Sequence, residues 1–127
     1  MGSMTGTARV AVDKMRAAGK KVGLVKISVL RPFPSKALMS AIKGAKAVAL
    51  AERSISMGYG GAIFGELAGH LVNEKQRPFL TSFVLGLGGR DILPSHYEDI
   101  VEKTEKALAS GKQVEMPEWA GLNREVL

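Results

Sequence analysis

The stretch Ala47-Val48-Ala49-Leu50-Ala51, followed by Glu52 and Arg53, decides the fold that the sequence predicts. Its consecutive apolar residues are typical of a short strand that helices cover on both faces, as in the parallel sheet of an α/β protein. The charged pair follows at the carboxyl end of that strand. Ligands and partners of open parallel sheets bind at this edge, so we expect the functional groups of this chain to lie there.

Helix and strand patterns alternate on either side of this stretch, and glycines or prolines separate them. The predicted helices span 5–18, 34–43, 62–74 and 95–111, and the predicted strands span 22–30, 47–51 and 78–87. Ser95 and Glu98 form a capping-box pattern at the start of the last helix. Glu102 and Lys106 are spaced to form an ion pair on its outer face.

This order predicts a three-layer α/β/α sandwich on a mainly parallel sheet, with right-handed crossovers. We expect the domain to cover residues 1–112 and residues 113–127 to form an extended tail without periodicity. The first helix has no strand before it, and a parallel sheet of three strands would have open edges. We therefore expect that the first strand of the sheet is missing from this sequence.

Composition excludes several classes of protein. The 127 residues contain no cysteine, so the chain forms no disulfide, ligates no iron–sulfur cluster and has no cysteine nucleophile; a cytoplasmic location fits. His70 and His96 lack metal-ligand spacing, and we expect neither a metal site nor a catalytic residue. No apolar run predicts a membrane span or a signal peptide. The net charge is +6, but no aromatic residues interleave with basic ones as in nucleic-acid binders.

Two glycine-rich runs follow predicted strands, namely Gly58-Tyr59-Gly60-Gly61 and Gly86-Leu87-Gly88-Gly89. Neither is a dinucleotide fingerprint, because Ile63 and Asp91 stand where the third glycine would be required. The first run lies just before a helix, where free backbone N–H groups could bind an anion. The alternative is a tight turn that needs glycine for its backbone conformation.

Charged residues collect where the predicted strands end. We expect a charged rim that docks against a neighbouring domain or binds an anion; the alternative is an internal network that ties the turns together. The candidate residues for interface or anion binding are Arg31, Glu52, Arg53, Gly60, Gly61, Arg90 and Asp91.

Five motifs in one order resemble the C-terminal part of the α subunit of the pyruvate:ferredoxin oxidoreductase family, over about residues 2–112. They are Gly2-Ser3-Met4-Thr5-Gly6-Thr7-Ala8, Arg31-Pro32-Phe33-Pro34, Ala49-Leu50-Ala51-Glu52-Arg53, Gly58-Tyr59-Gly60-Gly61-Ala62-Ile63-Phe64 and Gly86-Leu87-Gly88-Gly89-Arg90-Asp91-Ile92.

The resemblance implies a fold similar to the transketolase C-terminal domain. It also implies a parent enzyme that decarboxylates pyruvate on thiamine diphosphate, passes electrons through iron–sulfur clusters to ferredoxin and forms acetyl-coenzyme A. In this family the cofactors lie on other domains or subunits, so this chain is expected to be an inactive interface domain. Three alternatives stay open: a branched-chain 2-oxoacid enzyme, a domain of another thiamine enzyme, or a free-standing module for a small anion. The open sheet edge could also form a homodimer.

Overall fold

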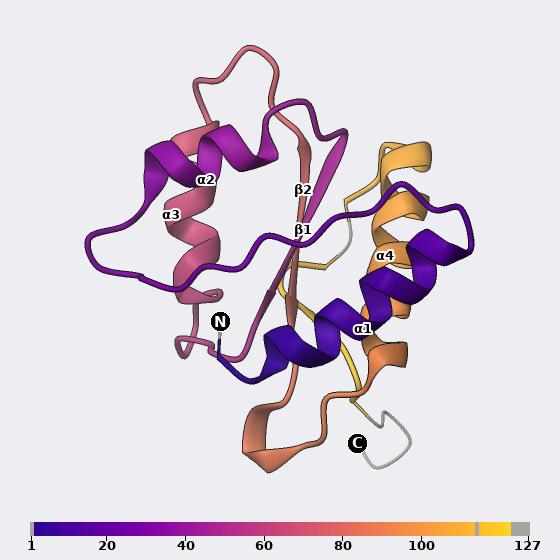
Figure 1. Ribbon diagram of the computed structural model, residues 1–127. Coiled ribbons are helices and arrows are strands. Elements are labelled where there is room, and N and C mark those ends of the chain that lie inside the picture. The colour runs from indigo at the N-terminus through magenta and orange to yellow at the C-terminus, as the bar shows by residue number, and fades with distance from the viewer. Residues whose placement is uncertain (1, 114, 123–127) are drawn as a thin grey trace.

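A parallel sheet of three strands forms the middle layer of the domain, with two helices on each side (Figure 1). The computed structural model describes residues 2–113 and 115–122. Its elements are α1 (Met4–Ala17), α2 (Ser35–Ile42), β1 (Ala47–Glu52), α3 (Ala62–Leu71), β2 (Phe79–Val84), the 3₁₀ turn η1 (Leu87–Gly89), α4 (Pro94–Ser110) and β3 (Glu118–Trp119). The predicted α/β/α class is therefore confirmed. No helix among the described residues is long and apolar enough to cross a membrane.

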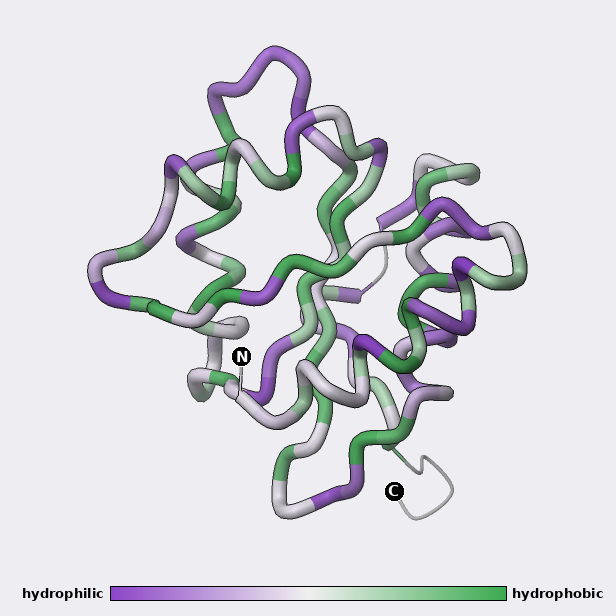
Figure 2. Tube along the Cα trace, in the orientation of Figure 1, coloured by the Kyte–Doolittle hydropathy of each residue, from purple (hydrophilic) through white to green (hydrophobic). Residues whose placement is uncertain are grey.

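The sheet separates two hydrophobic cores. Phe83 and Leu85 pack with the inner faces of α1 and α4, whereas Leu80 packs with α2 and α3 on the opposite side. This alternation follows from the two-residue period of a strand. Figure 2 shows the two long strands as largely hydrophobic, as expected for a sheet that helices cover on both faces.

Strand β2 is the central strand and the most buried. It pairs with β1 in a register that runs from Ala47 opposite Phe79 to Glu52 opposite Val84, and β3 pairs with its other edge. The hydroxyl groups of Thr81 and Thr104 form a buried hydrogen bond of 2.9 Å between β2 and α4. This bond and the surrounding core fix the sheet against α4.

The predicted strand over 22–30 is wrong. The structure assigns no regular element to residues 20–30, which lead from α1 towards α2. Val22 packs against the α1/α4 core and Ile27 against the α2/α3 core, so the segment passes from one helical layer to the other. Its β-branched composition is suited to a strand, but strand propensity produces a sheet only where a neighbouring strand supplies hydrogen bonds.

Other differences from the prediction lie at the ends of elements. The third strand comes from the expected tail, where Glu118–Trp119 pairs in parallel with β2. The Ser95–Glu98 capping box is wrong, because α4 begins at Pro94 and the Leu93 N–H donates to His96 Nδ1 at 3.2 Å. The expected Glu102–Lys106 ion pair is confirmed at 2.6 Å. The boundary at residue 112 and the missing first strand stay predictions.

Candidate functional site

Glu52 ends β1 but does not lie on an exposed rim. Its side chain is only 3% exposed. Its Oε2 accepts hydrogen bonds from the Ile63 N–H at 3.1 Å and the Ser54 hydroxyl at 3.4 Å. A carboxylate at the first turn of a helix is stabilised by free N–H groups and by the helix dipole. Glu52 therefore fixes the start of α3, while its Oε1 has no hydrogen-bond partner among the described residues.

Gly61 makes room for this carboxylate. A Cβ atom at Gly61 would lie 1.7 Å from Glu52 Oε1, whereas one at Gly60 would meet only Phe64 Cδ1, at 3.9 Å. The φ of Gly61 is −68°, so glycine is required there for space and not for backbone conformation. Because Glu52 occupies the amino end of α3, the two glycines form a turn around an internal carboxylate.

Arg53 connects the loops that follow β1 and β2. Its Nε donates to the Gly86 carbonyl oxygen at 2.9 Å. Gly86 has a φ of +71°, and a Cβ atom there would lie 2.5 Å from Ile92 Cδ1. Glycine is therefore required for both conformation and space, and the loop after β2 presents its carbonyl to Arg53. The sequence-based alternative of a network between the turns is partly realised in this contact.

Arg53, Arg90 and Asp91 meet around an open hollow of about 250 Å³, which we call the rim hollow. Its other lining residues are Ser3, Met4, Thr7, Gly89 and Ile92. It also adjoins the amino end of α1, whose first turn carries no acidic side chain. Within residues 2–113 and 115–122, neither arginine of the hollow has a carboxylate within ion-pair distance. The hollow thus exposes two guanidinium groups at the carboxyl edge of the sheet.

Arg31 lies elsewhere. Its Nη2 forms an ion pair of 2.5 Å with Glu66 Oε1 on α3, and it does not line the rim hollow. Nearby, Phe33 stacks on His70 with ring centroids 5.4 Å apart. His70 is exposed. The contacts of Arg31 depend on the path of residues 20–34, which local sequence patterns did not predict.

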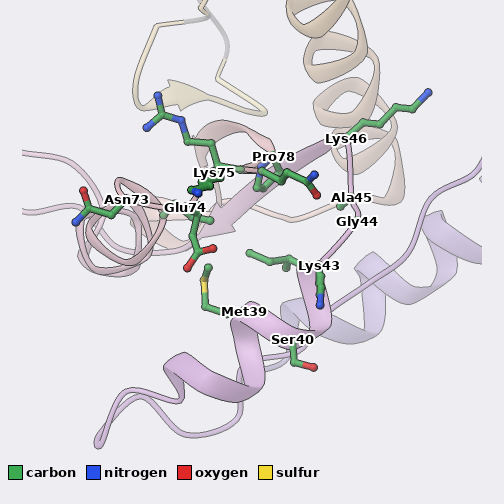
Figure 3. A pocket seen from close by; sticks show the side chains of 14 residues that line it. Met39, Ser40, Lys43, Gly44, Ala45, Lys46, Asn73, Glu74, Lys75 and Pro78 are labelled. Carbon is green, nitrogen blue, oxygen red and sulfur yellow. The ribbon is translucent and has the colours of Figure 1, made fainter.

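A larger open groove of about 910 Å³ lies at the opposite edge of the sheet, where the strands begin (Figure 3). Met39 and Glu74 point toward each other across it. Four cationic residues line it, namely Lys43, Lys46, Lys75 and Arg77. No sequence motif indicates this groove, because its residues come from the ends of α2 and α3 and from the two loops that follow these helices.

Comparison with known proteins identifies the family. Residues 1–97 match the family described as pyruvate:ferredoxin oxidoreductase core domain II. The chain is 40% identical over 127 residues to pyruvate synthase subunit PorA of Pyrococcus furiosus, covering all of this chain and 32% of the relative. Identity is 43% over 128 residues to PorA of Pyrococcus horikoshii, with the same shares covered. It is 39% over 124 residues to ketoisovalerate oxidoreductase subunit VorA of Pyrococcus abyssi, covering 98% of this chain and 31% of the relative.

The chain thus spans about a third of the length of these curated relatives. The family match covers most of the helices and both long strands, from α1 to the first turn of α4. It includes every residue of the rim hollow. This chain belongs to the family of pyruvate:ferredoxin oxidoreductase core domain II.

Proposed function

We propose that this chain is an interface domain in the α subunit of a cytoplasmic pyruvate:ferredoxin oxidoreductase. The parent enzyme would decarboxylate pyruvate oxidatively, transfer the acetyl group to coenzyme A and pass the electrons to ferredoxin. Family membership and the similarity to PorA subunits support this proposal. The observation that carries the interface role is the rim hollow, where Arg53 and Arg90 lie exposed at the edge that parallel sheets use for binding.

The residues of this chain do not fit the cofactors of such an enzyme. Without cysteine the chain cannot supply thiolate ligands for iron–sulfur clusters. Among the described residues no group of three His, Asp or Glu side chains is placed to hold a metal ion. The amino end of α3, where a diphosphate could bind, already holds Glu52. We therefore assign thiamine diphosphate and the clusters to other domains or subunits, and expect this chain alone to be inactive.

Arginine is suited to an interface because its planar guanidinium binds carboxylates and phosphates through two parallel hydrogen bonds. Arg53 is partly ordered in advance, since its Nε is already bound to the Gly86 carbonyl. This lowers the conformational entropy that it loses on docking. The partner would present an acidic group from a neighbouring domain or subunit. A finer version of the proposal adds the phosphate groups of coenzyme A as a ligand of the same two arginines.

Arg90→Ala in the assembled enzyme tests the interface role. We expect subunit association to weaken by roughly 5- to 30-fold, as for a moderate interface arginine, and turnover to fall with the lost complex. Arg16→Ala is the matched control, because Arg16 is an exposed arginine in the last turn of α1. Unchanged assembly and turnover of the Arg90→Ala enzyme would refute the proposal.

Titration of the isolated chain with coenzyme A tests the finer version. Saturable chemical-shift changes at Arg53 and Arg90 at about millimolar ligand would support it, as expected for a few exposed phosphate contacts. No saturable change would remove coenzyme A as a ligand and leave the docking role standing.

A branched-chain 2-oxoacid enzyme is the second candidate. The observation that favours it is the similarity to VorA, at 39% identity, which nearly equals the 40% found for one of the PorA relatives. The two candidates share this domain's proposed docking role. The ratio of turnover with pyruvate to turnover with ketoisovalerate, measured on the same assembled enzymes, separates them.

A further inference from the structure

The open groove at the edge where the strands begin carries an unbalanced positive charge. Four cationic side chains and one carboxylate line it and give a net charge of +3; they are Lys43, Lys46, Lys75, Arg77 and Glu74. Within residues 2–113 and 115–122, none of the four cations has a carboxylate within ion-pair distance. Half of the net charge of the chain, which is +6, is thus concentrated at one groove.

The carbonyl ends of two helices lie at this groove and balance only part of its charge. α2 ends at Ile42 and α3 at Leu71, and the carbonyl end of a helix is equivalent to about −0.5 of a charge. Arg77 already serves the end of α3, because its Nη1 donates to the Val72 carbonyl at 3.0 Å. Since the two ends offset only about one unit of charge, an excess of roughly +2 remains.

The three lysines are spread over the groove and do not converge on one point. All three are exposed, and Figure 3 shows Lys43 and Lys46 extending in different directions from the loop before β1. The N–H groups of Lys43 and Ala45 in this loop already donate to carbonyls at the end of α2. A compact phosphate is bound best by several converging donors. Separate ammonium groups are better suited to several carboxylates on a protein surface.

The groove also has an apolar part that a protein partner can cover. Met39 is half-buried, and Ile42 and Leu71 lie buried beside it. Methionine is flexible and adapts to partner side chains of different shapes. An apolar side chain of a partner can therefore contact Met39 while neighbouring carboxylates reach the lysines.

We propose that this groove binds an acidic segment of another protein. The segment places an apolar side chain over Met39 and carboxylates near Lys43, Lys46 and Lys75. It binds reversibly, because exposed ion pairs each contribute little and are screened by salt. The inference goes beyond the proposed function and does not depend on it, since the rim hollow shares no residue with this groove.

Two other occupants fit the groove less well. A second copy of this chain also has a net charge of +6, so the two copies would repel each other. A nucleic acid would supply phosphates, but no aromatic side chain lines the groove to stack on its bases.

Titration of the isotope-labelled chain with an acidic peptide tests the proposal by nuclear magnetic resonance. The probe is a peptide of about ten residues, made of glutamates with one leucine. At low ionic strength we expect saturable shift changes of the amides of Lys43, Lys46 and Lys75, with a dissociation constant of about a millimolar. Raising the ionic strength from about 0.01 M to about 0.15 M shortens the screening length from about 30 Å to about 8 Å, so binding should weaken several-fold.

A triple variant tests whether the lysines of the groove attract the peptide. Replacing them together as Lys43→Gln, Lys46→Gln and Lys75→Gln should weaken binding by about tenfold, because three exposed ion pairs are lost. Arg77 stays in place, since it also bonds the end of α3.

The matched control removes the same charge elsewhere. Lys21→Gln, Lys26→Gln and Lys112→Gln change three exposed lysines that do not line the groove. We expect binding within about twofold of the unchanged chain, because distant exposed charges are largely screened. An equal loss of binding in the two triple variants would show that net charge alone attracts the peptide, and this result would overturn the proposal.

Three further results would also overturn it. Shift changes at Arg53 and Arg90 without changes in the groove would place the acidic segment at the rim hollow. Tighter binding of inorganic phosphate or of a thymidine oligonucleotide than of the peptide would assign the groove to a small anion or to nucleic acid. Slower amide exchange of residues 43–46 and 73–77 in the assembled enzyme than in the isolated chain would show a permanent neighbour there. None of these results decides the Arg90→Ala assay, because Arg90 does not line the groove.

Discussion

Gly61→Ala tests the tightest contact of the site. The new Cβ atom would lie 1.7 Å from Glu52 Oε1 and 1.9 Å from its Cδ. The carboxylate would have to retreat by at least 1.3 Å to reach the shortest tolerated separation of 3.0 Å, since 3.0 minus 1.7 is 1.3. Glu52 is 3% exposed, so its carboxylate cannot move into solvent without disturbing the residues that cover it. We expect the retreat to break its hydrogen bond to the Ile63 N–H at the start of α3.

The cost follows from these changes. Loss of a buried hydrogen bond to a charged group costs about 1.5–3 kcal/mol, and forcing a methyl group into a filled site adds about 1 kcal/mol or more. The lower entropy of the unfolded chain with alanine offsets about 0.4–1 kcal/mol. We therefore expect Gly61→Ala to lower the free energy of unfolding by about 2–3 kcal/mol.

Urea unfolding followed by circular dichroism measures this change. Gly60→Ala is the matched control, because its Cβ atom would meet only Phe64 Cδ1 at the ordinary distance of 3.9 Å, and we expect a change within about 0.5 kcal/mol. The penalty of Gly61→Ala should shrink by about 1 kcal/mol or more when Glu52 is replaced by Ala, because the two residues are in contact. Equal stabilities of the Gly60→Ala and Gly61→Ala chains would refute this account of the site.

Two further predictions concern stability. Thr81→Val should lower the free energy of unfolding by about 1 kcal/mol. Thr104→Val should lower it more, because Thr104 Oγ1 also donates to the Ile100 carbonyl and its loss leaves the Thr81 hydroxyl without its partner. Urea unfolding measures both changes, and a larger loss for Thr81→Val would contradict this reasoning. Burial raises the pKa of Tyr97 in the folded chain above its ordinary 10.0. The stability that depends on the protonated phenol is therefore fully present below pH 10 and is lost as the pH rises through the pKa of Tyr97 in the folded chain. Tyr97→Phe should therefore flatten the fall of the thermal midpoint above pH 10, and an unchanged slope would contradict this assignment.

Local signals predicted most of the fold. The apolar run at 47–51 and the glycines that end helices, such as Gly19 and Gly111 with φ of +87° and +67°, are properties of a few neighbouring residues. Residues 22–30 carry the same kind of strand signal, but a strand requires a hydrogen-bonding neighbour that sequence propensity does not reveal. The two-residue strand Glu118–Trp119 has no local signal, because it is defined only by its pairing with β2.

The site was predicted only in part, again because local sequence signals do not show which distant segments come together. Arg53, Arg90 and Asp91 do meet at the carboxyl edge, as the strand ends indicated. Glu52 was grouped with Arg53 because the two are adjacent in sequence, yet successive residues of a strand point to opposite faces. That alternation could have indicated that Glu52 follows Leu50 into the side covered by α2 and α3. Arg31 could not be placed, because its position depends on the long-range path of the segment before it.

A structure of the assembled enzyme tests the interface role of the rim hollow through the exposure of Arg53 and Arg90. We expect a neighbouring domain or subunit to cover the rim hollow and to place an acidic or phosphate group within about 4 Å of at least one guanidinium. Two guanidinium groups that remain exposed to solvent in the complete complex would contradict it.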